Sequence, residues 1–152
     1  MPNWNSNIVK IFAAETKVRE YLIVHEDRTL FNMYILFPEY FPVDDVTGSN
    51  SWDYEWACTN TGAKRFPEIH IISEPDDEVT TLDYDTARTP NTGTLFRLHE
   101  LTGWRIECEY EEPGNGFEGT FACIDGQTHD DERQYRPYCD SCGQKYPMWE
   151  FD

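Results

Sequence analysis

The stretch YEEPGNGFEGTFAC, Tyr110 to Cys123, is typical of two β-strands joined by a tight turn. The turn falls on Pro113, Gly114, Asn115 and Gly116, the residue types that tight turns favour. The strands on either side are expected to run from Trp104 to Tyr110 and from Phe117 to Ile124.

The two strands alternate between apolar and charged residues. Side chains on a strand point to opposite faces with a period of two. One face of the hairpin therefore collects the apolar residues Trp104, Ile106, Cys108, Tyr110, Phe117, Phe121 and Cys123. The other face collects Arg105, Glu107, Glu109 and Glu111, which we expect to point to water.

Further elements are expected on the N-terminal side of this hairpin. Strands are predicted over 7–13, 29–37, 69–72 and 79–84, and helices over 15–24 and after an N-cap at Ser51. A longer helix is predicted from Asn91 or Thr92 to Thr102, with Leu95, Leu98 and Leu101 facing inward and Gly103 as its C-cap. This order predicts an α+β fold, an antiparallel sheet with helices on one face.

The chain has 152 residues with a formal charge of -17. Such a charge repels DNA, RNA and anionic lipid, so direct nucleic-acid binding is not expected. We find no signal peptide or membrane span. The number of cysteines, five, is odd, which argues against a framework of disulfide bonds. These features predict a cytoplasmic protein with reduced thiols.

Five short runs occur in order along the chain: MPNWNSN (1–7), FNMYILFP (31–38), WDYEWACTNTGAK (52–64), YDTARTP (84–90) and YEEPGNGFEG (110–119). Together they resemble the YubB-type ferredoxin-like domain family of phage and plasmid proteins, which includes Api-like phage proteins. The resemblance implies a ferredoxin-like domain over 1–126, without an iron–sulfur cluster, in a mobile-element protein of a bacterial host cell. Leu36, Thr61 and Arg88 depart from the family pattern.

Residues 127–152 are expected to form an acidic and aromatic C-terminal tail that contains a CxxC motif, Cys139 to Cys142. Two thiolates at this spacing can bind one zinc ion, which needs four ligands. Cys123 and His129 are the nearest candidates for the other two. A plain turn and a redox dithiol are the alternatives, and Cys123 also fits as a buried strand residue.

The acidic residues predict an interaction surface. From Glu68 to Asp131 there are 16 acidic residues against three arginines. The candidate partner-binding residues are Glu107, Glu109, Glu111, Glu112 and Glu118 of the hairpin, with Asp76, Asp77 and Glu78. The hypothesis is that the chain is a phage or plasmid accessory protein that binds and inhibits a host defence-related protein through that protein's basic surface. Nucleic-acid mimicry is one mechanism for such inhibition. A merely solvated acidic face is the alternative.

A second hypothesis is a small-ligand or enzymatic cleft between the helices and the sheet, with Lys64, Asp85 and Arg88 at its mouth. The sequence contains no phosphate loop, dinucleotide fingerprint or zinc-hydrolase motif. No catalytic residue is therefore predicted, and no enzymatic activity is expected. A zinc-stabilised structural module and pairing of two copies through the sheet are further hypotheses.

Overall fold

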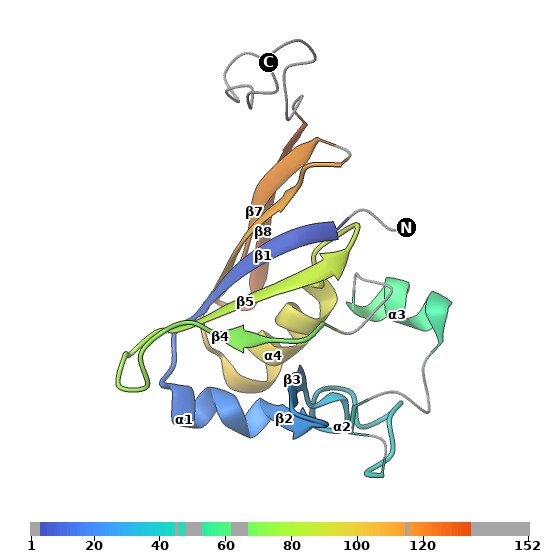
Figure 1. Ribbon diagram of the computed structural model, residues 1–152, viewed down its shortest axis with the longest axis vertical. Coiled ribbons are helices and arrows are strands. Elements are labelled where there is room, and N and C mark those ends of the chain that lie inside the picture. The colour runs from blue at the N-terminus through green and yellow to red at the C-terminus, as the bar shows by residue number, and fades with distance from the viewer. Residues whose placement is uncertain (1–3, 45, 48–52, 62–66, 115, 135–152) are drawn as a thin grey trace.

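The computed structural model describes residues 4–44, 46–47, 53–61, 67–114 and 116–134, and Figure 1 shows their arrangement. Six strands form one antiparallel sheet in the order β4-β5-β1-β6-β7-β8. They are β1 (Trp4–Ile11), β4 (His70–Ile71), β5 (Thr80–Ala87), β6 (Ile106–Glu112), β7 (Phe117–Ile124) and β8 (Gln127–Gln134). A separate hairpin pairs β2 (Leu22–His25) with β3 (Arg28–Phe31).

Four α-helices and one 3-10 helix complete the described chain: α1 (Glu15–Val18), η1 (Arg19–Tyr21), α2 (Met33–Leu36), α3 (Tyr54–Thr61) and α4 (Thr92–Thr102). Helix α4 connects β5 to β6, which lie on either side of β1. This split β-α-β crossover is the core of a ferredoxin-like arrangement. The predicted α+β class, with an antiparallel sheet and helices on one face, is confirmed.

The core lies between the sheet and α4, which lies behind β4 and β5 in Figure 1. Val9, Leu82 and Ile106 from the central strands are fully buried, as is Leu95 of α4, and Leu98 is almost so. Each such side chain contributes about 1.5–3 kcal/mol relative to exposure. We call this side of the sheet the helix face and the other side the open face.

Helix α4 begins and ends where the sequence predicts. Gly103 follows it with φ of 75°, the left-handed conformation of a glycine C-cap. Leu101, however, is 45% exposed, so its predicted inward orientation is wrong. His99 is buried instead: its Nε2 accepts from the Gly126 N–H at 2.9 Å, and its Nδ1 lies 2.6 Å from the Trp104 carbonyl oxygen.

Two predicted elements between residues 15 and 37 are corrected. The helix expected over 15–24 ends with η1, and the chain continues into β2. The strand expected over 29–37 ends at Phe31, because Asn32 caps a new helix, α2. The Asn32 Oδ1 accepts from the Ile35 N–H at 3.2 Å, a local bond that outweighs the β preference of the following residues.

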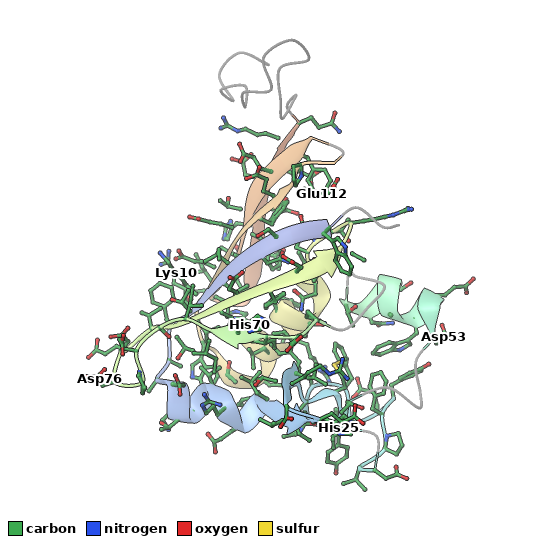
Figure 2. All side chains as sticks on the ribbon, viewed as in Figure 1. Lys10, His25, Asp53, His70, Asp76 and Glu112 are labelled. Atoms are coloured by element: carbon green, nitrogen blue, oxygen red, sulfur yellow. The ribbon has the colours of Figure 1, made fainter. Side chains whose placement is uncertain are left out.

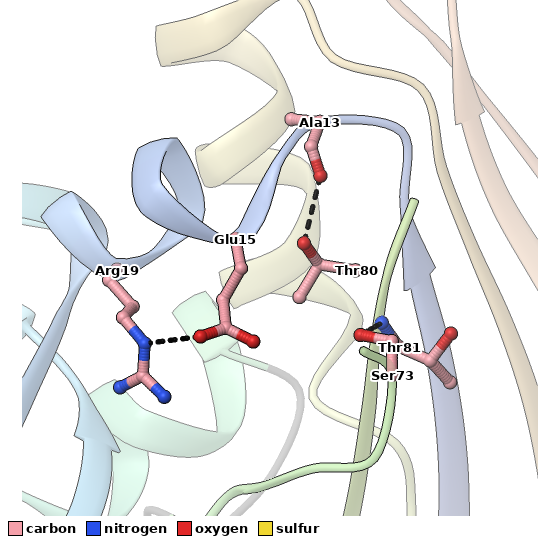
Figure 3. A network of polar contacts seen from close by, with 6 residues as sticks. All are labelled: Ala13, Glu15, Arg19, Ser73, Thr80 and Thr81. Carbon is pink, nitrogen blue, oxygen red and sulfur yellow. Dashed lines mark hydrogen bonds and ion pairs between the residues drawn. The ribbon is translucent and has the colours of Figure 1, made fainter. Parts of the chain in front are cut away.

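Side-chain hydrogen bonds attach the first helical segment to the sheet (Figure 3). The Thr80 hydroxyl at the start of β5 donates to the Ala13 carbonyl oxygen at 2.8 Å, just before α1. The Ser73 Oγ accepts from the Thr81 N–H at 2.9 Å and joins β5 to the segment after β4. The turn between β1 and α1 is thereby fixed against β5.

A buried polar cluster lies on the helix face where β1 pairs with β5. Asn7 donates from its amide to the Thr86 hydroxyl at 3.0 Å and to the Tyr84 carbonyl oxygen at 3.1 Å. The Tyr84 hydroxyl donates to the Asn91 Oδ1 at 2.6 Å, just before α4. These bonds fix the register of β1 against β5 and the start of α4, because buried polar groups need partners.

The sheet extends past residue 126, the expected end of the domain. Residues 127–134 form β8, which pairs with β7 along its whole length. The chain therefore stays in the sheet to Gln134, where a separate tail was expected. Among the described helices, none is both long and apolar enough to cross a membrane.

Candidate functional site: an acidic open sheet face

The strand register aligns the open-face side chains in rows that run across the sheet. The first row contains Asp85, Ser6, Glu111, Glu118 and Arg133, from β5 through β1, β6 and β7 to β8. The second row contains Asp83, Ile8, Glu109, Thr120 and Asp131 on the same strands. Neighbouring strands lie ~4.8 Å apart, and rows two residues apart lie about 6.7 Å apart.

These two rows hold most of the negative charge of the open face. We name Asp83, Asp85, Glu109, Glu111, Glu118 and Asp131 the acidic patch. In the next row Lys10 lies directly opposite Glu107, so opposite charges balance there. The acidic patch is thus a local feature of one end of the sheet, and the charge is not spread evenly over its surface.

Two hollows lie over the acidic patch and share Ser6 in their lining. One, of about 460 Å³, lies over β1, β6, β7 and β8, and its lining includes Glu109, Glu111, Glu118 and Asp131. The other, of about 510 Å³, lies over β1, β4 and β5, and its lining includes Trp4, Glu68, His70, Asp83 and Asp85. Together they form a trough across the open face with carboxylates on both flanks.

Tyr110 and Gly119 lie in the lining of the first hollow and hold β8 in place. The Tyr110 ring, from β6, crosses Gly119 of β7, and its hydroxyl lies 2.9 Å from Asp130 Oδ1 and 3.2 Å from Glu132 Oε1 of β8. Burial, and then the hydrogen bond to Asp130, raise the pKa of Tyr110 well above its ordinary value. The phenol therefore remains a proton donor that ties the edge strand to the sheet.

The predicted partner-binding glutamates separate into three groups. Glu109, Glu111 and Glu118 belong to the acidic patch. Glu107 lies on the same face, but Arg105 contacts it at 2.6 Å. Glu112 is fully buried at the end of β6, so its prediction as a surface residue is corrected. As an even-numbered residue of β6 it points to the helix face with Ile106, Cys108 and Tyr110, whereas the odd-numbered glutamates point to the open face.

The other predicted acidic residues, Asp76, Asp77 and Glu78, lie in the turn between β4 and β5. Asp77 accepts from the Glu74 N–H at 3.1 Å, which is a turn-stabilising bond. Figure 2 shows Asp76 and Glu112 at opposite ends of the molecule. The turn acids and the hairpin acids therefore do not form one surface.

The predicted zinc set is not assembled by the described residues. Cys123 faces the core and is fully buried, whereas His129 lies opposite Ala122 in the register and so points to the open face. The sheet separates the two side chains. Cys139 and Cys142 lie outside the described residues, and within those residues no group of three or more metal-binding side chains occurs.

Cys108 and Cys123 are buried and form no disulfide. Burial is the main cause that raises the pKa of each thiol to about 12. A thiol with such a pKa is protonated at neutral pH and is a poor nucleophile or metal ligand. Both residues act as small apolar side chains in the core.

The cleft predicted between the helices and the sheet near Asp85 and Arg88 is not formed by these residues as expected. Asp85 points to the open face and lines the second hollow, away from the helices. Arg88 is exposed just after β5, with φ of 71°. Lys64 lies outside the described residues.

Asp83 and Asp131 belong to the acidic patch but were not among the residues predicted from the sequence. Asp83 lies in a predicted strand, and the alternation of Asp83 and Asp85 with Leu82 and Tyr84 was the available signal. Asp131 lies in β8, whose sequence QTHDDERQ has no apolar alternation because all eight residues are exposed. No periodic signal could have revealed that strand.

A scan against protein-family models found no match. A search of curated proteins also found none. A search of solved structures found a protein api92 from Yersinia pseudotuberculosis, described with the family model DUF1281. It is 22% identical to this chain with a TM-score of 0.47, and the match covers 68% of this chain but only 39% of the Yersinia protein.

Proposed function

We propose that this protein is a non-catalytic binding protein that uses the open sheet face to bind a basic surface of another protein. The observation that carries this proposal is the acidic patch, six carboxylates on four strands lining a trough that the helices leave uncovered. Complementary charge gives such a surface fast association and selectivity for basic partners.

The arrangement of the acidic patch is unfavourable for folding alone. Glu111 lies directly opposite Glu118 on paired strands, and Asp83 and Asp85 share one face of β5. Like charges at directly opposite positions destabilise a sheet, by roughly the 0.2–1 kcal/mol that an opposite-charge pair contributes. A face that only needs to be solvated can carry paired opposite charges, as Lys10 and Glu107 do in the third row. The clustering supports a role in binding.

The arrangement of the acidic patch in two rows favours nucleic-acid mimicry as the form of binding more than a single row of glutamates would. A single strand places carboxylates about 6.7 Å apart, whereas a DNA strand places a phosphate every ~3.4 Å. The patch spans four strand-to-strand steps, about 19 Å, and its two rows together supply six carboxylates over that width. Each row thus has about one carboxylate per 6 Å, so the two rows together reach about half the charge density of a duplex, which carries a phosphate every ~1.7 Å.

The biological setting belongs to the same proposal. The motif resemblance to YubB-type phage and plasmid proteins supports a mobile-element accessory protein in a bacterial cytoplasm. A host protein that normally handles nucleic acid, such as a defence nuclease, presents the basic surface that the acidic patch would complement. Inhibition would follow from occupation of that surface.

Two variants with equal charge change test the proposal. The patch variant carries Asp83→Asn, Asp85→Asn and Glu109→Gln, and the turn variant carries Glu74→Gln, Asp76→Asn and Glu78→Gln. Each removes three negative charges, and all six residues are at least partly exposed. Tagged wild type and both variants are used to capture proteins from a bacterial lysate at ~0.1 M and ~0.5 M salt.

We expect the wild type and the turn variant to retain the same basic protein at low salt and to lose it at high salt, where exposed charges are screened. The patch variant should retain at least about tenfold less, because three charge contacts of ~0.5–1 kcal/mol each are lost. Equal loss with the turn variant, or retention that is insensitive to salt, would contradict the proposal. Capture of no protein by wild type would favour a ligand in the hollow beside Trp4.

A further inference from the structure

We propose that the outer edge of β8 is a second docking surface, which binds an extended basic segment of a partner protein as an added strand. β8 is the last strand of the six-stranded sheet, and all eight of its residues are exposed. No other described strand pairs with its outer edge. The inference rests on the proposed function only in taking the partner to be basic.

The turn between β7 and β8 determines which main-chain groups point outward. Asp125 and Gly126 have φ of 52° and 80°, as in a two-residue type I′ turn. The flanking residues Ile124 and Gln127 therefore form a hydrogen-bonded pair, and such pairs alternate along an antiparallel ladder. The main-chain N–H and C=O groups that point away from β7 belong to Thr128, Asp130, Glu132 and Gln134.

This outer edge is regular enough to accept a strand. β8 pairs with β7 at every position from Gln127 to Gln134, without a bulge, and contains no proline. Natural sheet edges are commonly protected by bulges, prolines, very short strands or charged side chains. Of these β8 has the charges, which oppose pairing with another acidic strand and favour a basic one. Strand addition to an exposed edge is an established mode of peptide recognition in proteins.

The charges of β8 determine which strand can pair with it. Asp130 and Glu132 point to the helix face, whereas Asp131 points to the open face beside Arg133, whose Nη2 lies 4.0 Å from the Asp131 Oδ2. An added strand would therefore meet two carboxylates on the helix-face side and a carboxylate next to an arginine on the other. A second copy paired antiparallel over residues 128–134 would place Asp131 opposite Asp131 and Asp130 opposite Glu132. Like charges at opposite positions are destabilising, whereas Lys or Arg at these positions would be favoured.

The edge is continuous with the acidic patch, since Asp131 belongs to both. A partner segment that pairs with β8 would thus hold the rest of the partner beside the trough. The edge contributes main-chain hydrogen bonds and the acidic patch contributes long-range attraction. The two surfaces therefore make separable contributions to one interface.

The test uses the full chain, labelled with ¹⁵N, and a synthetic eight-residue peptide of alternating Lys and Val with blocked ends. A matched peptide has the same side chains but an N-methyl group on every amide, which removes the N–H donors of both edges without a change in charge. The protein variants are Thr128→Pro, which removes one outward N–H, and Thr128→Val, which keeps it. Affinities come from chemical-shift titration, and amide hydrogen exchange reports on Thr128, Asp130 and Glu132.

We expect the unmodified peptide to bind and to slow exchange of these three amides. The N-methylated peptide should bind at least about tenfold more weakly. Thr128→Pro should weaken binding about fivefold, equivalent to ~1 kcal/mol for one hydrogen bond, whereas Thr128→Val should bind like the wild type. If the Thr128→Pro chain is unfolded by its amide spectrum, the N-methylated peptide alone decides.

Three results would overturn the inference. Equal binding of both peptides would show that charge alone attracts them. Amides of Thr128, Asp130 and Glu132 that are already protected in the free chain would show that its own C-terminal segment or a second copy occupies the edge. Absence of peptide binding would show that the edge does not accept a basic strand. None of these results bears on capture of a partner by the acidic patch, so the two proposals fail separately.

Discussion

Replacement of Gly119 by alanine tests how Tyr110 holds β8 against the sheet. A Cβ atom at Gly119 would lie 2.5 Å from the Asp131 carbonyl oxygen and 2.7 Å from the Tyr110 hydroxyl oxygen. Both distances are shorter than van der Waals contact, and one of the two atoms belongs to the backbone. To accommodate the methyl group, the Tyr110 ring must rotate away or β8 must move from β7.

The size of the effect follows from what must be lost. Overpacking in a close-packed region costs about 1–3 kcal/mol. Displacement of Tyr110 also removes its hydrogen bond to Asp130, worth roughly 1–2 kcal/mol. Loss of the flexible glycine from the unfolded chain returns about 0.4–1 kcal/mol. We therefore expect Gly119→Ala to lower the free energy of unfolding by about 1.5–4 kcal/mol.

Urea denaturation followed by circular dichroism measures this change. The control Tyr110→Phe removes the hydroxyl alone and should cost no more than about 2 kcal/mol. A double-mutant cycle adds Tyr110→Leu. The chain with both Gly119→Ala and Tyr110→Leu should lose less stability than the sum of the losses measured for the two single variants, because the alanine methyl group no longer meets the tyrosine ring. A Gly119→Ala chain as stable as the wild type would refute the packing of Tyr110 over Gly119.

Two further predictions concern buried groups on the helix face. Burial raises the pKa of Cys108 and Cys123 to about 12, so the folded chain keeps both protons where unfolded thiols, with pKa near 9.0, release them. The free energy of unfolding should be flat below about pH 8.5 and fall toward pH 10 by up to ~1.4 kcal/mol per pH unit for each thiol. A Cys108→Ala, Cys123→Ala chain should lose this part of the slope and keep only the part that the raised pKa values of Tyr84 and Tyr110 add near pH 10 and above. His99→Leu should cost about 2–3 kcal/mol in thermal unfolding, because the Gly126 N–H and the Trp104 carbonyl oxygen lose their partner. A loss below about 0.5 kcal/mol would exclude a stabilising role for His99.

The central fold could be predicted from local patterns. Alternation of apolar and charged residues predicts the hairpin of β6 and β7, and leucines at helical spacing predict α4. The need for a positive φ after the helix explains the glycine at 103. The segment from Thr29 to Phe37 could not be assigned in this way. Its residues favour a strand, but one asparagine cap and tertiary packing of Met33 and Leu36 decide for a helix.

The candidate site was only partly predictable, because it depends on register between distant strands. The row of glutamates on β6 is visible in the sequence, whereas the neighbours that make it a two-dimensional array come from β5, β7 and β8. Glu112 was misassigned because adjacent glutamates on one strand necessarily point to opposite faces. β8 has no hydrophobic period, since its stability comes from pairing and from Tyr110.

Chemical labelling of carboxylates in the free protein and in a captured complex would test the central claim most directly. A carbodiimide with glycine ethyl ester modifies exposed Asp and Glu side chains, and mass spectrometry reads the extent at each residue. We expect the partner to protect Glu109, Glu111 and Asp131 of the acidic patch, while Asp76 and Glu78 in the turn are labelled to the same extent as in the free chain. Protection of the turn residues with unchanged labelling of the acidic patch would contradict the account.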